Sequence, residues 1–210
     1  MKEEWRVYTK KADFKAIGDK YKIDQVVARI IRNRDIITPE QYEEYINGDL
    51  TSLHSPWLLK DMERAADIVR SAVDDGKAIR IVGDYDIDGI NSIYILYSGL
   101  RRFGADVDYV VPHRVTDGYG INERLIDEAH AAGRRVIITC DNGIAALDAI
   151  AYAKEEGLTV LVTDHHDIPY QEEDGVRSYL RSQADAIVNP KQKECGYPVS
   201  YTHLTLPTKL

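Results

Sequence analysis

The sequence predicts an α/β fold: a parallel sheet of about five strands with helices on both faces, preceded by a small helical N-terminal region. From residue 77 onward, short apolar runs alternate with helical segments of about a dozen residues, which is the pattern of βαβ units. Two of these segments end at Gly104 and Gly133, and 44% of the 210 residues are hydrophobic. That content supports a buried core. We therefore expect helical structure over 1–76 and an α/β domain over 77–198.

The N-terminal region carries helix start signals. Asp24 can cap a helix over 25–34, and Thr38-Pro39-Glu40-Gln41 has the pattern of a capping box with proline at the first helical position. Apolar residues recur at helical spacing over 61–73, and the pattern stops at Asp74-Asp75-Gly76. We interpret this region as a helical cap on the larger domain.

The α/β domain should contain five strands in a parallel sheet, where ligands bind beyond the carboxyl ends of the strands. The expected strands are 78–82, 107–111, 135–139, 159–162 and 184–188. The expected helices between them are 90–103, 122–132 and 144–156. Function should therefore be sought in the residues that follow each strand.

Composition excludes several classes of protein. No run approaches the roughly 18 apolar residues of a membrane span, and the start lacks the apolar core of a secretory signal, so we expect a cytoplasmic protein. Cys140 and Cys195 suggest neither a disulfide framework nor a CxxC metal site. The net charge of −8 argues against a broad basic surface for nucleic acid. Phosphate binding should instead be local, at a place where acidic residues collect divalent cations.

The first strand leads into an acidic segment, Gly83 to Gly89, with Asp84, Asp86 and Asp88 at every second position. If the segment is extended, these carboxylates share one face, and cations would relieve their repulsion. A solvated acidic turn is the alternative. An EF-hand loop is excluded because Ile95 stands where a bidentate glutamate is required. A phosphatase of the haloacid-dehalogenase type remains a weaker alternative, since its DxDG directly follows the strand.

The third and fourth strands also end in polar residues. Asp141, in Cys140-Asp141-Asn142-Gly143, could cap the next helix or complete a metal site, and nearby backbone N–H groups could hold a phosphate. The fourth strand ends in Thr163-Asp164-His165-His166-Asp167.

Neighbouring side chains of an extended segment point to opposite sides, so we expect one histidine of the pair to bind metal and the other to face substrate. Asp164 and Asp167 could fix an imidazole tautomer. Carboxylate and imidazole ligands without thiolates suit Mn²⁺ or Mg²⁺, and Cys140 is expected to be a core residue.

The second strand leads into the loop Pro112 to Gly120. Arg114 offers a planar fork for a phosphate, Tyr119 offers a ring for a base, and Gly118 and Gly120 allow close backbone approach. A glycine-rich surface loop is an equally good interpretation of this segment alone. The segment Asn189-Pro190-Lys191 after the fifth strand is a weaker candidate.

The chain resembles RecJ-like members of the DHH superfamily over roughly Leu53 to Pro198. The resemblance lies in the content and order of five segments: GDYDIDG, PHRVTDGYG, CDNG, TDHHD and VNPK. The resemblance implies a DNA repair and recombination nuclease that removes mononucleotides from the 5′ end of single-stranded DNA with divalent metal. It implies metal ligation by Asp84, Asp86, Asp88, Asp141 and His165, with His166 completing the catalytic set. It implies substrate binding by His113, Arg114, Gly118, Tyr119, Gly120, Asn142 and Gly143.

The resemblance also implies a further aspartate, a DHHA1-type domain and an OB-fold downstream. Residues 199–210 instead resemble translated sequencing-adapter DNA, so we expect a non-native, poorly packed tail and little nuclease activity from the 210-residue chain alone. Single-stranded DNA is the expected partner, together with single-strand-binding or helicase proteins, and no membrane. The alternatives are a DHH phosphodiesterase acting on short oligonucleotides, cyclic dinucleotides or polyphosphate, and a catalytically silent replication scaffold.

Overall fold

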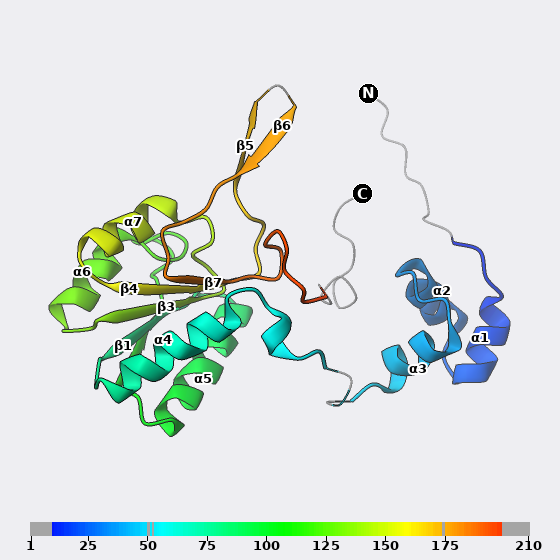
Figure 1. The fold of residues 1–210 in the computed structure, drawn as a ribbon. Coiled ribbons are helices and arrows are strands. Elements are labelled where there is room, and N and C mark those ends of the chain that lie inside the picture. Colours follow the sequence, from blue (N-terminus) through cyan, green and yellow to red (C-terminus); the bar gives the residue numbers. More distant parts are fainter. Residues whose placement is uncertain (1–9, 50, 52, 174, 199–210) are drawn as a thin grey trace. The chain divides into compact units, whose positions relative to one another are not determined.

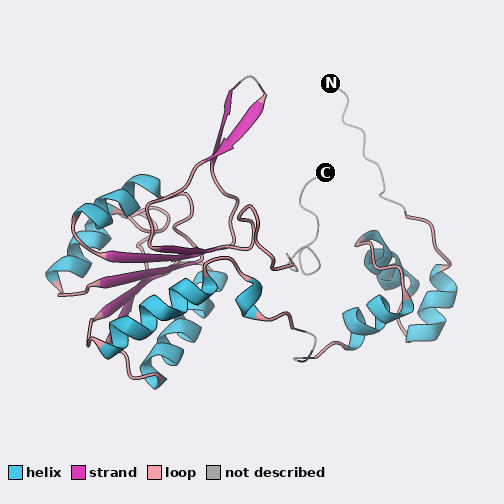
Figure 2. Ribbon diagram, in the orientation of Figure 1, coloured by secondary structure: helices cyan, strands magenta, loops and turns pink. Residues whose placement is uncertain are grey.

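The computed structural model describes residues 10–49, 51, 53–173 and 175–198, and these divide into two compact units. The expected adapter-derived tail at 199–210 lies outside the described residues. The first unit comprises residues up to His54, and the second runs from Ser55 to Pro198. Figure 1 shows the fold of each unit, and Figure 2 shows the helical character of the first and the mixed character of the second.

In the described part of the N-terminal unit, three α-helices form a small cluster. Its helices are α1 (Phe14–Tyr21), α2 (Gln25–Asn33) and α3 (Pro39–Asn47). The caps are those that the sequence predicts: the Asp24 carboxylate accepts from Val26 N, and Thr38 and Gln41 form a capping box. The three helices enclose a core of their own, centred on Ile31, Ile36 and Tyr42.

The second unit contains a five-stranded parallel sheet, as the sequence predicts. Its strands are β1 (Ile79–Val82), β2 (Val107–Val110), β3 (Val136–Cys140), β4 (Thr159–Thr163) and β7 (Ala186–Val188), in the order β2-β1-β3-β4-β7. Its helices are α4 (Met62–Asp74), α5 (Ile87–Arg102), α6 (Glu123–Ala131) and α7 (Leu147–Glu155), with the short 3₁₀ helix η2 (Pro56–Leu58) before them.

Helices cover both faces of this sheet. On one face, α4 and α5 pack against side chains such as Ile79, Ile81 and Ile138. On the other face, α6 and α7 pack against Ile137 and Val160. The strands β3, β4 and β7 therefore bury both of their faces, which explains why they are continuous apolar runs in the sequence, whereas the edge strand β2 leaves Tyr109 exposed.

The α4 segment belongs to the α/β unit and not to the N-terminal region where the sequence analysis placed it. Its residues Ala65 and Ala72 are buried in the same core cluster as the sheet. The prediction of a helix with an apolar face over 61–73 is confirmed by α4. The periodicity of apolar residues does not indicate which part of the protein that face packs against. The compact α/β unit consequently begins at Ser55 and not at residue 77.

A two-stranded hairpin was not predicted. It consists of β5 (Tyr170–Glu173) and β6 (Val176–Tyr179), which pair in antiparallel register between β4 and β7. All eight strand residues are exposed. Figure 1 shows the hairpin standing away from the sheet. With no buried face, its sequence lacks the alternation that marks a strand.

The strand order places a switch point between β1 and β3. The chain passes from β1 through α5 to β2 on one side, whereas β3, β4 and β7 follow on the other side. In open parallel sheets, ligands bind at the carboxyl edge next to such a point. In addition, none of the helices in the described ranges is long and apolar enough to cross a membrane.

Candidate metal centre

Asp84 is buried in the turn between β1 and α5. It is 2% exposed, and its Oδ1 atom has no hydrogen-bond partner among the described residues. The turn is tight because Gly89 lies against it: a Cβ atom at Gly89 would be 2.5 Å from the Asp84 carbonyl oxygen. A buried carboxylate oxygen without a donor is costly unless a cation completes it.

The segment after Asp84 is not extended, so Asp84, Asp86 and Asp88 do not share one strand face. Asp86 is the N-cap of α5, and its carboxylate accepts from Asp88 N at 3.0 Å and Gly89 N at 2.9 Å. The helix therefore begins at Ile87, three residues before the expected start, because the capping aspartate lies earlier in the chain. Asp88 belongs to the first helical turn.

Asp141 follows β3 in a left-handed backbone conformation, with φ of 62°. Its Oδ1 lies 2.8 Å from His165 Nε2. The interpretation of Asp141 as a helix cap is wrong: α7 begins at Leu147 and not at residue 144, and its N-cap is Ala146, which makes no side-chain cap hydrogen bond. The Asp141 side chain pairs instead with His165.

The Asn142 side chain connects the segments that surround the site through hydrogen bonds. Its side-chain amide donates to the carbonyl oxygens of Val82 at 3.0 Å and Cys140 at 2.9 Å, and its Oδ1 accepts from Ile121 N at 3.2 Å. The residue is 0% exposed. The structure thus buries this proposed substrate ligand and uses its side chain to join β1, β3 and the loop after β2.

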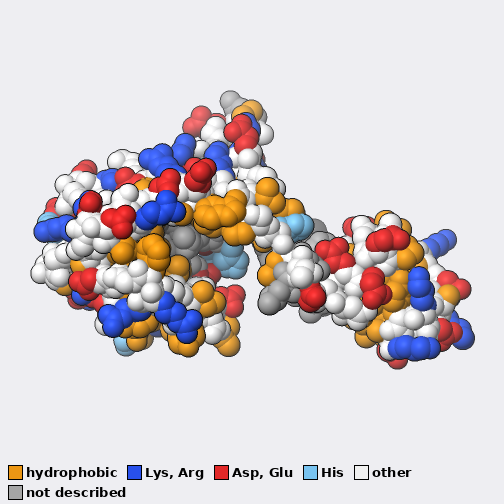
Figure 3. All heavy atoms as spheres, turned by 60° about the horizontal axis from the view of Figure 1, so that its bottom comes forward, with side chains coloured by type: hydrophobic (Ala, Val, Ile, Leu, Met, Phe, Trp, Pro, Cys, Tyr) orange, Lys and Arg blue, Asp and Glu red, His pale blue; other side chains and the backbone are white. Residues whose placement is uncertain are grey.

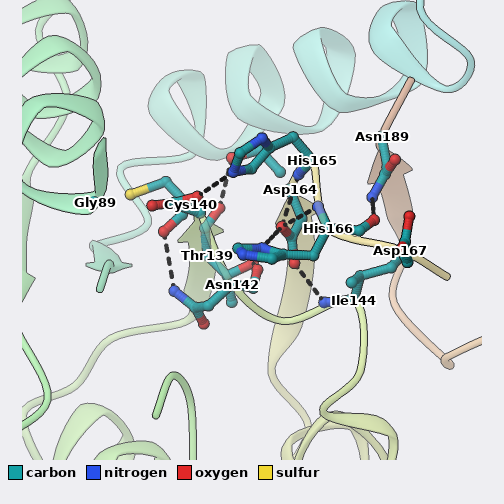
Figure 4. Close-up of polar contacts among 12 residues, drawn as sticks. Gly89, Thr139, Cys140, Asn142, Ile144, Asp164, His165, His166, Asp167 and Asn189 are labelled. Atoms are coloured by element: carbon teal, nitrogen blue, oxygen red, sulfur yellow. Dashed lines mark hydrogen bonds and ion pairs between the residues drawn. The ribbon is translucent and has the colours of Figure 1, made fainter. Parts of the chain in front are cut away.

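Asp164 organises the histidine pair. Its Oδ1 accepts from the backbone N–H groups of His165 and His166 at 2.7 and 3.0 Å, and from His166 Nδ1 at 2.7 Å. Its Oδ2 accepts from Ile144 N at 2.9 Å. Figure 4 shows these contacts around the buried carboxylate. Asp164 fixes the His166 ring as the sequence predicts, whereas Asp167 pairs with Lys191 at 2.8 Å.

The two imidazole rings do not point to opposite sides, contrary to the sequence prediction. Their centroids lie 4.7 Å apart, and Figure 4 shows both rings on the same side of the chain. The reason is that β4 ends at Thr163, and the turn held by Asp164 replaces the alternation of a strand. Asn189, which is fully buried, supports this turn by donating to the His166 carbonyl at 3.0 Å.

Two groups of ligand atoms result, and they share Asp141. Asp84, Asp86 and Asp141 form one group, and Asp141, His165 and His166 form the other; within each group the atoms lie within 4.8 Å of one another. Asp88 belongs to neither group. The donors are oxygen and imidazole nitrogen, which suits Mn²⁺ or Mg²⁺. Together with the unpartnered Asp84 oxygen, this donor set fits two adjacent divalent cations.

The electrostatics of the cluster agree with a cation site. The pKa of Asp141 is raised to about 6, chiefly because burial disfavours its charged form and also because Asp86 repels it, while His165 and His166 act in the opposite direction. Burial and four nearby aspartates raise the pKa of Tyr119. Burial raises the pKa of Cys140 to about 12, so its thiol remains protonated and the residue belongs to the core, as expected.

The loop after β2 supplies one wall of the site. The Tyr119 hydroxyl donates to the Asp141 carbonyl at 2.8 Å and lies 3.4 Å from both His166 ring nitrogens. Gly120, with φ of 70°, lies so close to Asn142 that a Cβ atom would be 3.1 Å from its side chain. Gly118 meets no such neighbour. His113 accepts from Val115 N and Thr116 N, each at 3.4 Å, within its own turn.

Two residues of this wall were missed by the sequence analysis. Tyr85, between Asp84 and Asp86, is half-buried, and its ring lies 5.3 Å from the guanidinium carbon of Arg114. Arg124 holds Asp117 through two hydrogen-bonding contacts of 2.8 and 2.6 Å and so closes the loop. Asp117 is visible in the sequence as part of Thr116-Asp117-Gly118, but nothing in the sequence indicates that Arg124, seven residues later, is its partner.

Clefts open on both sides of the cluster. The first, of about 800 Å³, is lined by Tyr119, Arg124, Gly143, Asp164 and His166 and by the start of α7. The second, of about 580 Å³, contains Asp88, Asp141 and His165 beside apolar side chains such as Met62 and Ile95. On the face drawn in Figure 3, basic and acidic side chains are interspersed over this unit. That face therefore offers a polyanion mixed charges and not a broad basic surface.

Comparison with known proteins gives a family match over most of the α/β unit. The family model described as DHH family, N-terminal domain, matches residues 78–209. The chain is 35% identical over 198 residues to the single-stranded-DNA-specific exonuclease RecJ of Bacillus subtilis (strain 168), covering 94% of this chain and 24% of that protein. It is 33% identical over 175 residues to the protein of the same name from Escherichia coli (strain K12), covering 82% and 28%.

The chain is also similar to solved structures of RecJ. A crystal structure of exonuclease RecJ bound to manganese matches 72% of this chain and 38% of its own, with a TM-score of 0.56 and 31% identity. A structure of RecJ in complex with Mn²⁺ from Thermus thermophilus matches 95% of this chain and 28% of its own, with a TM-score of 0.60 and 25% identity. The chain thus spans about a quarter of the length of the curated relatives it matches.

Proposed function

The chain belongs to the DHH family, and from this premise we propose that it forms the metal-binding part of a single-stranded-DNA exonuclease that hydrolyses phosphodiesters from the 5′ end. The observation that carries the proposal is the pair of ligand groups that share Asp141 at the switch point of the sheet. Relatives that bear the name single-stranded-DNA-specific exonuclease, and structures described with manganese, support the substrate and the metal.

Each residue has a distinct part in this proposal. Asp84, Asp86, Asp141 and His165 would hold Mn²⁺ or Mg²⁺, with Asp88 adjoining them in the second cleft. Bound cations supply activation of water and neutralisation of charge on the phosphate.

His166, whose Nδ1–H donates to Asp164, presents its half-exposed ring to the first cleft, where its second ring nitrogen faces the substrate. Arg114 offers further donors, and the half-exposed Tyr119 ring offers a stacking surface to a base. The remaining loop residues, His113, Gly118, Gly120 and Gly143, would shape the backbone around the strand.

The first test is metal binding by the 210-residue chain. Calorimetric titration with Mn²⁺ should show binding that disappears in the Asp84→Asn, Asp141→Asn double variant. Retention of wild-type affinity in that variant would rule out the two-group site. Failure of the wild-type chain to bind Mn²⁺ would favour the catalytically silent scaffold.

The second test is hydrolysis by a version extended to the length of the curated relatives. Single-stranded DNA labelled at the 5′ end should release labelled mononucleotide at once with Mn²⁺, whereas DNA labelled at the 3′ end should shorten gradually. Cleavage of cyclic dinucleotides, short oligonucleotides or polyphosphate in preference to long single strands would instead identify the alternative DHH phosphodiesterase. The 210-residue chain alone should show little activity in the same assay.

Such an enzyme would work in the cytoplasm on single strands during DNA repair and recombination. Helicases that expose such strands and single-strand-binding proteins that coat them are the protein partners that the proposal implies. Stimulation of hydrolysis by either protein would support this part of the proposal.

A further inference from the structure

Arg114 differs from the other described arginines of the α/β unit because its guanidinium lies over a ring next to the candidate site without an acidic partner. Arg80 and Arg124 are committed to aspartates through paired contacts, and Arg134 also pairs with acids. Arg114 is exposed, and within the described ranges no carboxylate pairs with it. Its contact is with the ring of Tyr85, 5.3 Å from the guanidinium carbon to the centroid. The guanidinium is therefore oriented by a ring face while its N–H donors remain available to an anion.

The Tyr85 ring packs against a second aromatic ring. Its ring meets Tyr119 edge-on, with centroids 6.5 Å apart and planes at 88°. The Tyr119 hydroxyl is in turn fixed on the Asp141 carbonyl and lies against His166. Two rings therefore connect the Arg114 guanidinium to the residues of the metal cluster. Within the described part of the chain, the Tyr85 hydroxyl makes no hydrogen bond, so the contribution of this residue comes from its ring.

The position of Tyr85 in the chain strengthens this connection. It lies between Asp84, which is buried at the end of β1, and Asp86, which caps α5. Both neighbours are fixed by the fold, so the backbone of Tyr85 has little freedom. A ring carried on such a backbone is a rigid support, whereas Arg114 lies in an exposed loop and has a long flexible side chain.

We propose that Tyr85 is a positioning residue that holds the Arg114 guanidinium beside the metal cluster so that it can bind a phosphate group of the substrate. The inference rests on the proposed function for the identity of the substrate. It goes beyond that function because it assigns the tyrosine between two metal-ligating aspartates a role in substrate affinity and not in metal binding. Without the ring, Arg114 would have to be ordered by the substrate itself, and affinity would decrease.

The proposal is tested with Tyr85→Leu, Tyr85→Phe, Arg114→Ala and the double variant Tyr85→Leu, Arg114→Ala. In the extended version of the protein, Tyr85→Leu should raise KM for a 5′-phosphorylated oligothymidylate about 3- to 10-fold, the range of an oriented cation–π contact. The value of kcat should stay within about twofold, as expected when uniform binding is lost. Tyr85→Phe, which keeps the ring, should restore the wild-type KM.

The double variant separates positioning from a structural role. If Tyr85 acts through Arg114, Tyr85→Leu should have no further effect once Arg114 is alanine, because contacting residues are not additive. Mn²⁺ affinity of the 210-residue chain should be the same in wild type and Tyr85→Leu. Tyr109→Leu, an exposed tyrosine on β2 that pairs with Tyr97, is the matched surface control and should leave KM unchanged.

Three results would overturn the inference: additive effects of the two substitutions, equal damage from Tyr85→Phe and Tyr85→Leu, or loss of Mn²⁺ affinity in Tyr85→Leu. Failure of the proposed function gives a different pattern, because the wild-type protein would then show neither Mn²⁺ binding nor hydrolysis of the oligonucleotide.

Discussion

At the scale of single residues, Asp164 accounts for most of the geometry of the candidate site. One buried carboxylate receives three backbone N–H groups and one imidazole N–H. It ties the turn after β4 to Ile144, in the segment after β3, and it turns both histidine rings to the same side. Removing such an acceptor would leave several buried donors without a partner, which is costly.

The ligand assignment gives a first prediction. His165→Ala or Asp141→Ala in the extended protein should reduce Mn²⁺-dependent hydrolysis by at least roughly 100-fold, the upper end of losses seen even for residues that only support a ligand. Asp167→Asn is a matched control on the same turn: it removes an exposed pair with Lys191, worth at most about 1 kcal/mol, and should leave activity nearly unchanged. Near-normal activity in His165→Ala would contradict the site.

The raised pKa of Asp141 gives a second prediction, on stability in metal-free buffer. The folded state binds the Asp141 carboxyl proton more tightly than the unfolded state does. This difference stabilises the folded state fully below about pH 4, and the stabilisation is lost as pH rises through about 6. In EDTA, the free energy of unfolding of the wild type should therefore fall relative to Asp141→Asn between pH 4 and 7. The expected difference is on the order of 1–3 kcal/mol.

Urea unfolding at each pH measures this difference, and shared effects of other groups cancel in the comparison with Asp141→Asn. Addition of Mn²⁺ at pH 7 should reverse the loss in the wild type, because cations compensate the buried charge. A pH-independent difference between the two proteins would show that the carboxyl is not destabilised by burial.

The proximity of the aspartates and histidines could be predicted from sequence, but the directions of their side chains could not. The aspartates and histidines follow strand ends, and parallel strands bring their carboxyl ends together, so proximity could be inferred. The orientation of the histidine pair depends on one side chain, Asp164, replacing the strand pleat with a turn. Tyr85 and Arg114 lie in separate segments, one after β1 and the other after β2, and nothing in either segment indicates that contact.

At the scale of elements, the β1–α5 turn depends on the lack of a side chain at Gly89. A Cβ atom there would lie 2.5 to 2.7 Å from backbone atoms of Asp84, which cannot move aside as a flexible side chain can. The close approach places the start of α5 against the buried Asp84. The geometry of Asp84 and Asp86 is therefore set by backbone packing.

A third prediction follows from this contact. Gly89→Ala should destabilise the protein by about 1–3 kcal/mol, as for other overpacked sites, and should weaken Mn²⁺ binding by displacing Asp84. Gly99→Ala in the same helix is the matched control, since a Cβ atom there meets nothing within 4 Å. It should stabilise the helix by roughly 0.5–1 kcal/mol. Thermal unfolding and calorimetry of both variants would test the prediction, and equal effects would refute it.

Elements with a buried face were predictable from sequence, and those without one were not. The caps at Asp24 and Thr38 and all five sheet strands are confirmed because local hydrogen bonds and apolar runs specify them. The start of α7 was misplaced because Ile144 is apolar and fits a helical period, yet it serves the turn tied to Asp164. The β5–β6 hairpin relies on cross-strand contacts such as Arg177 with Glu172 and Tyr170, which leave no periodic signal.

At the scale of the whole molecule, the two units have separate cores. Core residues of the α/β unit come from α4 onward, and those of the N-terminal unit come from residues before 47. All the ligands of the candidate site belong to the α/β unit. Sequence could predict that the sheet is parallel, but the order of its strands depends on long-range pairing and only the structure gives it.

A fourth prediction concerns this separation. A chain of residues 55–198 should fold and bind Mn²⁺ with an affinity close to that of the 210-residue chain, because the core clusters of the described α/β unit are built from its own residues. Circular dichroism and calorimetry on the shorter chain check this expectation. An unfolded product would show that residues before 55 contribute to the stability of the α/β unit.

The burial of Asn142 also bears on chemical ageing. Asparagine followed by glycine is the dipeptide most prone to deamidation, because the next backbone nitrogen can attack the side-chain amide with little steric hindrance. The chain has such a pair at Asn47-Gly48, where Asn47 is exposed, and another at Asn142-Gly143, where three hydrogen bonds fix the amide. The folded protein should deamidate at Asn47 and remain intact at Asn142 during prolonged storage. An aspartate at 142 could not donate to Val82 and Cys140, so the same fold that forms the site also protects it from slow covalent damage.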